Sequence, residues 1–152
     1  ADSVVTKFSD PHMVQGQRRY TDGNAIRASD GKGWLLTLYA TNGVHKQTMP
    51  LSIHVYYSND LRIWQFRARL GTQFLASENS MVRLKDNRIM MVFRSELPQK
   101  KLFQTFSSND GFTWSEPSTL SGVGAGGDPH SCEPKLLLVC QMSRNCSNFL
   151  CS

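Results

Sequence analysis

The chain has 152 residues, enough for one domain with a buried core, and 39% of them are hydrophobic. Its formal charge of +5 is spread along the sequence, and only Arg18-Arg19 and Lys100-Lys101 are adjacent basic pairs. Nucleic-acid-binding domains gather Lys and Arg between aromatic residues, so we expect no nucleic-acid partner. The longest apolar runs, Ile89 to Phe93 and Leu136 to Cys140, are far too short for a membrane span.

The first part of the chain predicts a lead-in segment followed by two short strands. The sequence begins Ala1-Asp2-Ser3 without Met, which is typical of a processed or excised product. Residues 1–23 are irregular, and we expect one strand among them. Asn24 to Arg27 and Trp34 to Tyr39 then read as strands joined by a tight loop, Asp30-Gly31-Lys32-Gly33.

A polar stretch, Ala40 to Pro50, leads into a strand that ends in a distinctive turn. From Leu51 to Tyr57 apolar and polar residues alternate, which indicates a half-buried strand. The turn that follows is Ser58-Asn59-Asp60-Leu61-Arg62-Ile63-Trp64. A similar turn, Ser108-Asn109-Asp110-Gly111-Phe112-Thr113-Trp114, occurs fifty residues later.

The elements before this second turn repeat those before the first. Two strands flank an Asp turn, and a loop then leads to a third strand that runs into the second Ser-Asn-Asp turn. Each unit therefore comprises about four short antiparallel strands, which cannot bury their faces without stacking on a neighbour. The elements are Asn79 to Arg83, Asp86-Asn87, Ile89 to Phe93, Ser95 to Lys100 and Leu102 to Phe106. No stretch shows a sustained helical period, so the sequence predicts an all-β fold.

The second turn has the chemistry of a tight hairpin loop. Asp110 can accept backbone N–H bonds within the loop, Ser108 can close a second bond, and Gly111 can adopt positive φ. Trp114 can cover these bonds with its indole ring. In the first turn Leu61 stands in the place of Gly111 and resists positive φ, so we expect a different turn there.

The sequence after the second turn predicts only the beginning of a third unit. After a glycine-rich loop, Gly122 to Gly127, the stretch Ser131 to Val139 reads as the opening strand of another unit. The Asp-Gly turn and second apolar strand that should follow are missing. Residues 140–152 read instead as a divergent polar tail that contains cysteine.

The Ser-x-Asp turns, each ending in Trp, resemble the Asp box, or BNR repeat, of the sialidase (neuraminidase) superfamily. The resemblance implies a six-bladed β-propeller, with blade-like repeats at about 22–66, 77–116 and 128–139 of this single partial domain. A closed ring of six blades needs about 300 residues at about 50 per blade, so this chain supplies about two and a half blades. Self-association could complete the ring. The Asp-box residues are expected to be structural: Ser58, Asp60, Trp64, Ser108, Asp110, Gly111, Thr113 and Trp114.

The same resemblance implies an exo-glycosidase that hydrolyses terminal sialic acid-type sugars, without a cofactor or a metal, and the positive charge suits such an anionic ligand. The family uses three arginines for the sialate carboxylate, an aspartate acid/base and a tyrosine nucleophile paired with glutamate. Its first arginine lies in an Arg-Ile-Pro step, where this chain has Thr21-Asp22-Gly23, so the catalytic set is incomplete. The alternatives are a carbohydrate-binding or adhesion module that lacks the chemistry, and a structural half-propeller.

Four polar residues at comparable places in the repeats are the candidates for this site. Asp22 and Glu78 each stand eight residues before an Asp turn, and Glu133 opens the third unit, so these are the catalytic candidates. Arg94 ends a strand and could bind a carboxylate through a bidentate fork. The alternative is that these residues pair with one another or satisfy backbone groups at the blade edges. His12 and His130, each in an Asp-Pro-His step, are expected to be structural.

The cysteines Cys132, Cys140, Cys146 and Cys151 all lie in the C-terminal part of the chain. Their spacing contains no Cys-x-x-Cys knuckle, which argues against zinc, and two disulfides are possible with three connectivities. Asn145-Cys146-Ser147 is a glycosylation sequon. Disulfides and a glycan would both fit a secreted or extracellular protein, whereas a divergent tail with free thiols is the other interpretation.

Overall fold

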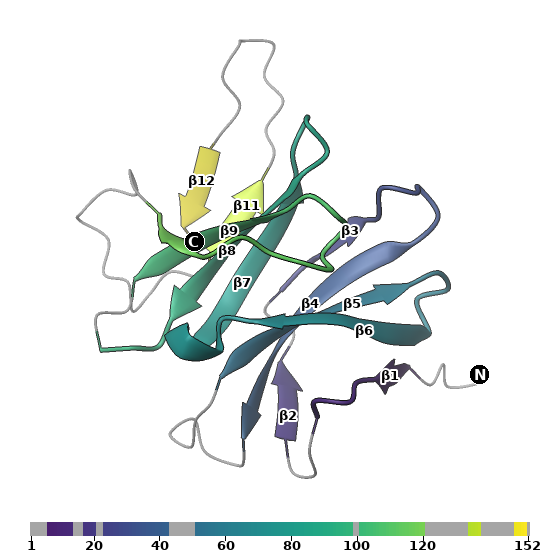
Figure 1. Cartoon of the computed structure of the whole chain (residues 1–152), viewed down its shortest axis with the longest axis horizontal. Coiled ribbons are helices and arrows are strands. Elements are labelled where there is room, and N and C mark those ends of the chain that lie inside the picture. Colours follow the sequence, from purple (N-terminus) through teal and green to yellow (C-terminus); the bar gives the residue numbers. More distant parts are fainter. Residues whose placement is uncertain are drawn as a thin grey trace.

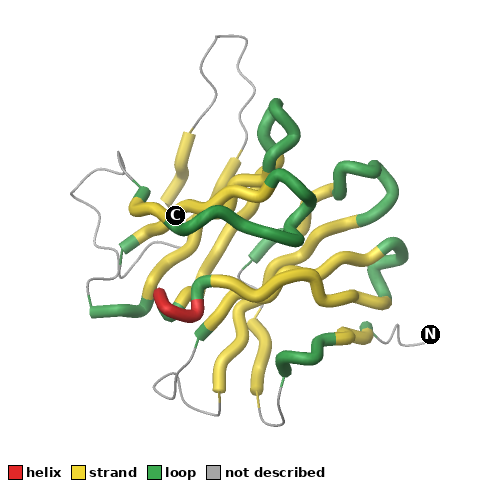
Figure 2. The backbone as a smooth tube through the Cα atoms, in the orientation of Figure 1, coloured by secondary structure: helices red, strands yellow, loops and turns green. Residues whose placement is uncertain are grey.

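The computed structural model describes residues 6–13, 17–20, 23–42, 51–98, 101–120, 134–137 and 148–151. These residues form an all-β fold, as predicted, with two main sheets (Figure 1). Among the described residues the helical segment is the short 3-10 turn η1 at Thr72–Phe74, which lies between the two sheets along the chain (Figure 2). Among the described residues no helix is long and apolar enough to cross a membrane.

The first sheet is curled and contains six strands in the order β1-β6-β5-β4-β2, with β3 also paired to β4. All of its pairs are antiparallel except that of β1 with β6, which is parallel. Its strands are β1 (Lys7–Ser9), β2 (Gln17–Tyr20), β3 (Ala25–Arg27), β4 (Trp34–Asn42), β5 (Ser52–Ser58) and β6 (Ile63–Leu70). The lead-in segment therefore contributes two strands, not one, because both β1 and β2 pair with later strands.

The second sheet is an antiparallel meander in the order β10-β9-β8-β7. Its strands are β7 (Ala76–Arg83), β8 (Ile89–Ser95), β9 (Leu102–Ser107) and β10 (Ser118–Thr119). Two further strands, β11 (Pro134–Leu137) and β12 (Asn148–Cys151), pair with each other in antiparallel fashion, and β11 lies against β7 and β8. The strand predicted within Ser131 to Val139 is therefore present as β11, whereas the expectation that no second strand follows it was wrong, because β12 lies in the predicted tail and pairs with β11.

The main core lies between the two sheets, where β7 packs against β3, β4 and β5 (Figure 1). Alternation along the strands sends one set of apolar side chains into this layer. The first sheet contributes Leu35, Ile53 and Val55, and the second contributes Met91 and Phe93, all fully buried. Burying side chains of this size stabilises the fold by about 1.5–3 kcal/mol each relative to exposure. The strands predicted at Leu51 to Tyr57 and Ile89 to Phe93 thus form opposite walls of one core.

A second apolar cluster lies on the other face of the first sheet and is covered by β1. The ring of Phe8 contacts that of Tyr56 edge-on at 5.0 Å and stacks on Trp64 at 6.2 Å between centroids. Leu38 completes the buried part of the cluster. The N-terminal segment is therefore packed onto the sheet through an aromatic side chain.

The predicted Asp turns join the first two strands of each unit and share one geometry. Asp30 Oδ1 accepts hydrogen bonds from the N–H groups of Lys32 (2.8 Å) and Gly33 (3.0 Å), and Asp86 Oδ1 accepts one from Arg88 N–H (3.1 Å). The residue after each aspartate is left-handed, with φ of 67° at Gly31 and 69° at Asn87. Gly and Asn tolerate the left-handed region of φ better than other residues, so the residue type at Gly31 and Asn87 favours this turn at both places.

Candidate functional site

The first Ser-Asn-Asp turn closes on itself as its sequence suggests. Ser58 Oγ accepts a hydrogen bond from Leu61 N–H at 2.9 Å, and Asp60 Oδ1 accepts bonds from the N–H groups of Arg62 (2.8 Å) and Ile63 (2.9 Å). Leu61 adopts a left-handed conformation with φ of 61°, so the expectation that this residue would resist positive φ was wrong. Trp64 is buried under the turn, in the cluster that packs on Phe8.

The second turn uses residues one position earlier than predicted. Ser107 Oγ accepts a bond from Gly111 N–H at 2.9 Å, and Asn109 Oδ1 accepts one from Thr113 N–H at 2.9 Å. Trp114 Nε1 donates to the carbonyl of Gly111 at 3.1 Å. Ser107 and Asn109 therefore do for this turn what Ser58 and Asp60 do for the first, and the local roles expected of Ser108 and Asp110 were wrong.

The reason is that the second turn is one residue longer. It has two consecutive left-handed residues, Asp110 (φ 57°) and Gly111 (φ 83°), where the first turn has only Leu61. The positive φ expected of Gly111 is confirmed. Aligning the two turns on their tryptophans therefore places Ser108 opposite Ser58, although Ser107 is its structural counterpart.

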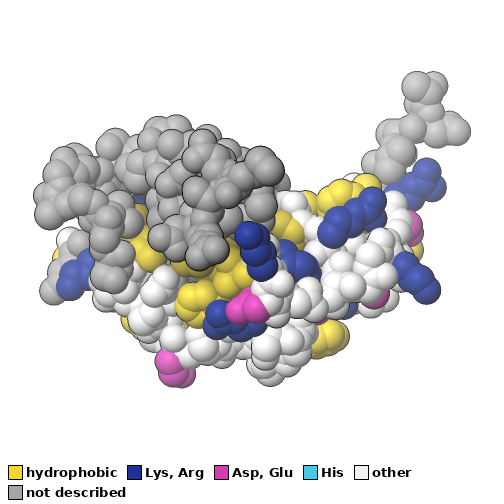
Figure 3. All heavy atoms as spheres, turned by 90° about the horizontal axis from the view of Figure 1, so that it is seen from above, with side chains coloured by type: hydrophobic (Ala, Val, Ile, Leu, Met, Phe, Trp, Pro, Cys, Tyr) yellow, Lys and Arg dark blue, Asp and Glu magenta, His cyan; other side chains and the backbone are white. Residues whose placement is uncertain are grey.

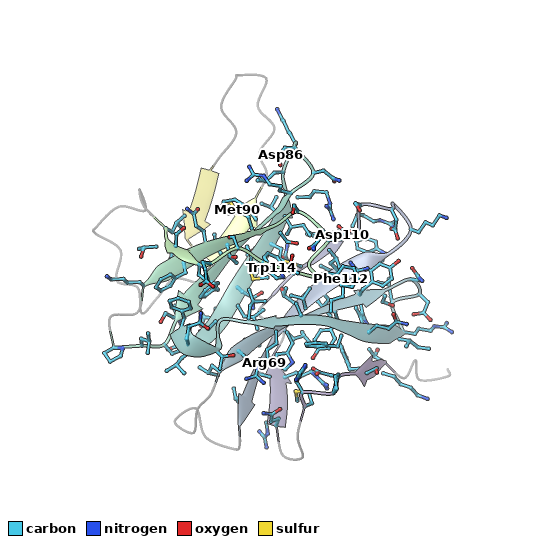
Figure 4. All side chains as sticks on the ribbon, in the orientation of Figure 1. Arg69, Asp86, Met90, Asp110, Phe112 and Trp114 are labelled. Carbon is cyan, nitrogen blue, oxygen red and sulfur yellow. The ribbon has the colours of Figure 1, made fainter. Side chains whose placement is uncertain are left out.

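The carboxylate of Asp110 is consequently turned outward and joins the two units. Its Oδ2 accepts hydrogen bonds from Ser29 N–H (2.9 Å) and Ser29 Oγ–H (2.7 Å), and its Oδ1 is ion-paired with Arg83. Burial alone would raise the pKa of Asp110, but the bonds from Ser29 and the charge of Arg83 lower it below its ordinary value. Asp110 thus ties the box of the second sheet to the β3–β4 turn of the first (Figure 4).

Arg67 on β6 forms a second connection between the sheets. Its guanidinium lies over the rings of Tyr57 at 4.0 Å and Phe112 at 4.3 Å, and Nη1 donates to the carbonyl of Asp110 at 2.6 Å. Partial burial lowers the pKa of Arg67, and the charge of Asp110 opposes that shift. This arrangement fixes Phe112 against the first sheet.

Of the four predicted site residues, the structure describes Glu78 and Arg94 and brings them together. Arg94 Nη1 lies 2.6 Å from Glu78 Oε2, off the direction of an ideal hydrogen bond but close enough for a tight ion pair. On the other side Arg94 binds Glu96 Oε1 through Nε at 2.9 Å and Nη2 at 2.6 Å. Asp22 and Glu133 lie outside the described residues.

This Arg94 cluster, comprising Glu78, Arg94 and Glu96, is half-buried. The exposed fractions of the three side chains are 17%, 15% and 19%. Arg94 donates hydrogen bonds from Nε and Nη2 to Glu96, and its Nη1 is ion-paired with Glu78, which leaves two of its five N–H groups for an additional acceptor. Two carboxylates around one guanidinium orient it and carry a net charge of −1. The cluster can therefore present a fixed guanidinium, at the cost of some repulsion toward an anion.

The most enclosed polar network of the described residues was not predicted from the sequence. The side chain of Asp10 is fully buried, and its Oδ2 accepts a short hydrogen bond from the Tyr56 hydroxyl and one from His54 Nδ1 at 2.7 Å. His54 Nε2 lies 3.1 Å from Ser52 Oγ, and Arg19 Nε donates to the Tyr56 oxygen at 3.1 Å. We refer to these five residues as the Asp10 network.

The electrostatics of the Asp10 network favour a neutral His54 beside an ionised Asp10. Burial is the largest influence on His54 and lowers its pKa, although Asp10 opposes the shift. Burial would raise the pKa of Asp10, but the bonds from Tyr56 and His54 lower it. Burial and the bond to Asp10 raise the pKa of Tyr56, so this phenol stays protonated. A phenol held in this way is a hydrogen-bond donor and not a nucleophile.

The sequence did carry one signal for the network, the Asp10-Pro11-His12 step. Asp10 Oδ1 accepts a hydrogen bond from His12 N–H at 2.9 Å, which closes a local turn at this step. The other carboxylate oxygen reaches β5, more than forty residues later in the chain. Polar residues at alternate positions of β5, Ser52 and His54, mark the strand face that meets Asp10.

No model of a known protein family matches the chain, and no curated protein matches it significantly. The distribution of charged side chains on the face shown in Figure 3 does not indicate a ligand class either. On the face shown in Figure 3, Lys and Arg side chains are dispersed among neutral atoms with occasional Asp or Glu.

Proposed function

We propose that this chain is part of a sialidase-type β-propeller that recognises terminal sialic acid-type sugars through Arg94. The observation that carries the proposal is the guanidinium of Arg94, held between Glu78 and Glu96 with two N–H donors left for a ligand. Such a fork matches the two oxygens of a sugar carboxylate. Pre-orientation by the two glutamates reduces the entropy lost when the ligand binds.

Two features support the propeller assignment. Each unit is an antiparallel meander in which a left-handed Asp turn joins strands one and two and a Ser-Asp or Ser-Asn box follows strand three. The units stack face to face, and β11 of a third unit lies against β7 in turn. A propeller is the architecture in which such stacking continues around an axis.

Hydrolysis would be the activity of the completed ring. The family reaction needs a reactive tyrosine, and Tyr56 does not fit because its raised pKa and its bond to Asp10 keep it protonated. We therefore assign to this chain the anion-binding part of an exo-glycosidase, with self-association as one way to supply the rest. The second candidate is a carbohydrate-binding module, which the occupied Tyr56 hydroxyl favours.

The test is the affinity of the chain for 3′-sialyllactose, measured by NMR titration, with lactose as the ligand that lacks the carboxylate. Arg94→Lys keeps the charge but removes the fork, and we expect at least tenfold weaker binding of sialyllactose. Arg88→Lys is the matched control, because Arg88 also pairs with a carboxylate but is about half exposed at the β7–β8 turn. Equal affinity of the Arg94 and Arg88 variants would remove Arg94 from the site.

Turnover separates the enzyme from the binding module. A fluorogenic sialoside is incubated with the chain while light scattering gives the particle mass. A defined oligomer with turnover supports the completed enzyme. Sialyllactose binding without turnover in any oligomer supports the binding module.

A further inference from the structure

A hollow of about 310 Å³ lies between β6 of the first sheet and the second box turn. It belongs to neither the Arg94 cluster nor the Asp10 network. Phe112 and Trp114 lie between the turn and β6 (Figure 4). The lining residues from the β6 side are Ala68, Arg69, Leu70, Gly71 and Gln73, and those from the turn side are Phe112, Thr113, Trp114, Ser115, Glu116 and Pro117.

The hollow and the Arg94 cluster lie on opposite faces of the second sheet. Gly71 in the lining of the hollow lies beside the ring of Phe93, which faces the main core. Arg94 follows Phe93 on β8, and successive side chains of a strand point to opposite faces of the sheet. A ligand in the hollow is therefore independent of one at Arg94.

Phe112 is the feature of the hollow that core packing does not explain. It is 56% exposed, so much of its apolar surface is accessible to a ligand. Arg67 stacks on the ring at 4.3 Å and is itself held by Tyr57 and the Asp110 carbonyl, so the ring is fixed in place. An exposed aromatic ring that is already immobilised loses little entropy when a ligand stacks on it.

The groups around Phe112 are polar and of mixed kind. Gln73 and Glu116 have exposed side chains with an amide and a carboxylate, and Thr113 and Ser115 add hydroxyl groups. Amide and carboxylate groups can exchange paired hydrogen bonds with neighbouring hydroxyls of a sugar. An aromatic ring beside such groups suits a pyranose, which has an apolar C–H face and a polar rim.

We propose that this hollow binds a neutral hexopyranose residue, with its C–H face on Phe112 and its hydroxyls on Gln73 and Glu116. The lining contains one cation, Arg69, and one anion, Glu116, so its formal charge is zero, which suits a neutral sugar and gives an acidic one no net attraction. The site gives the chain a glycan contact that does not use sialic acid. It does not rest on the proposed role of Arg94.

The test is an NMR titration of the ¹⁵N-labelled chain with lactose, which presents neutral pyranoses only. We expect amide shifts centred on Gln73, Phe112 and Glu116, and at least fivefold weaker binding in Phe112→Ala. Ile63→Ala is the matched control, because Ile63 is also a large exposed apolar residue (53%) but lies outside this hollow. Glu116→Gln is a second variant that leaves the aromatic contacts intact, and we expect it to weaken binding as well.

Lactose binding by the Arg94 and Phe112 variants tests the hollow independently of the proposed role of Arg94. Lactose binding that Arg94→Lys leaves unchanged and Phe112→Ala weakens supports the hollow, whatever happens to sialyllactose. Lactose binding that depends on Arg94 and not on Phe112 overturns it and assigns the sugar to the Arg94 cluster. Absence of saturable lactose binding also overturns it.

Discussion

Asp110 provides the sharpest test of how the two units are joined. Its carboxylate accepts two hydrogen bonds from Ser29 and pairs with Arg83, and the Arg83 and Asp110 side chains are only 21% and 14% exposed. Hydrogen bonds to charged groups contribute about 1.5–3 kcal/mol in such settings. We therefore expect Asp110→Ala to lower the free energy of unfolding by about 2–3 kcal/mol.

The assay is a double-mutant cycle measured by urea unfolding, with Asp110→Ala, Arg83→Met and the double variant. We expect a coupling of about 1 kcal/mol between the two residues, because they are in direct contact and partly shielded. Arg88 and Asp86 provide the matched pair, with the same groups at 2.7 Å but exposed fractions of 48% and 52%. Solvent screening should leave that pair without measurable coupling.

A coupling between Arg83 and Asp110 no larger than that between Arg88 and Asp86 would refute the reasoning. It would mean that burial at the junction does not strengthen the ion pair. Asp110→Asn provides the remaining check, because it keeps the shape and one acceptor oxygen but removes the charge. If Asp110→Asn unfolds as readily as Asp110→Ala, the charge and not the shape accounts for the stabilisation.

Two further predictions concern the Asp10 network and the box turn. The folded pKa of His54 is below its ordinary value of 6.5, so the unfolded chain takes up this proton first and stability falls as the pH drops through about 6.5. His54→Asn, which keeps a donor toward Asp10, should flatten urea-unfolding stability between about pH 7 and 5; an unchanged slope would contradict this. Gly111→Ala should cost more than Gly31→Ala in thermal unfolding, because both are left-handed but only the former brings a Cβ to 3.1 Å from Val55 Cγ1. We expect about 2 kcal/mol for Gly111 and about 1 kcal/mol for Gly31, and equal losses would show that the contact with Val55 relaxes.

The sequence predicted most of the strands because their signals are local. Alternation along Leu51 to Tyr57, and Asp turns followed by Gly31 or Asn87, depend on residues within a few positions of each other. The same local reasoning misjudged the second box. Either Ser107 or Ser108 could accept the hydrogen bond that closes the turn, and the length of the turn determines that Ser107 does so.

The Asp10 network could not be predicted because it depends on distant partners. Asp10 and Tyr56 are 46 residues apart, and neither residue type requires the other. The parallel pairing of β1 with β6 brings Asp10 and Tyr56 together. The strand β1 has only three residues, and a segment this short has no alternating pattern from which its position could be predicted. The sequence identified Glu78 and Arg94 as candidate site residues. It did not identify Glu96, which is the second carboxylate paired with Arg94.

The contrast between Asp60 and Asp110 shows how one turn type can acquire a second role. The exposed carboxylate of Asp60 accepts hydrogen bonds from two N–H groups of its own turn. In the longer second turn a neutral Asn109 satisfies the local N–H group, which releases the charged Asp110 for Ser29 and Arg83. The added residue also places Phe112 over Arg67, next to the hollow. One inserted residue thus joins the two units and exposes an aromatic ring beside their junction, which is why we place the neutral-sugar site at the second box and not at the first.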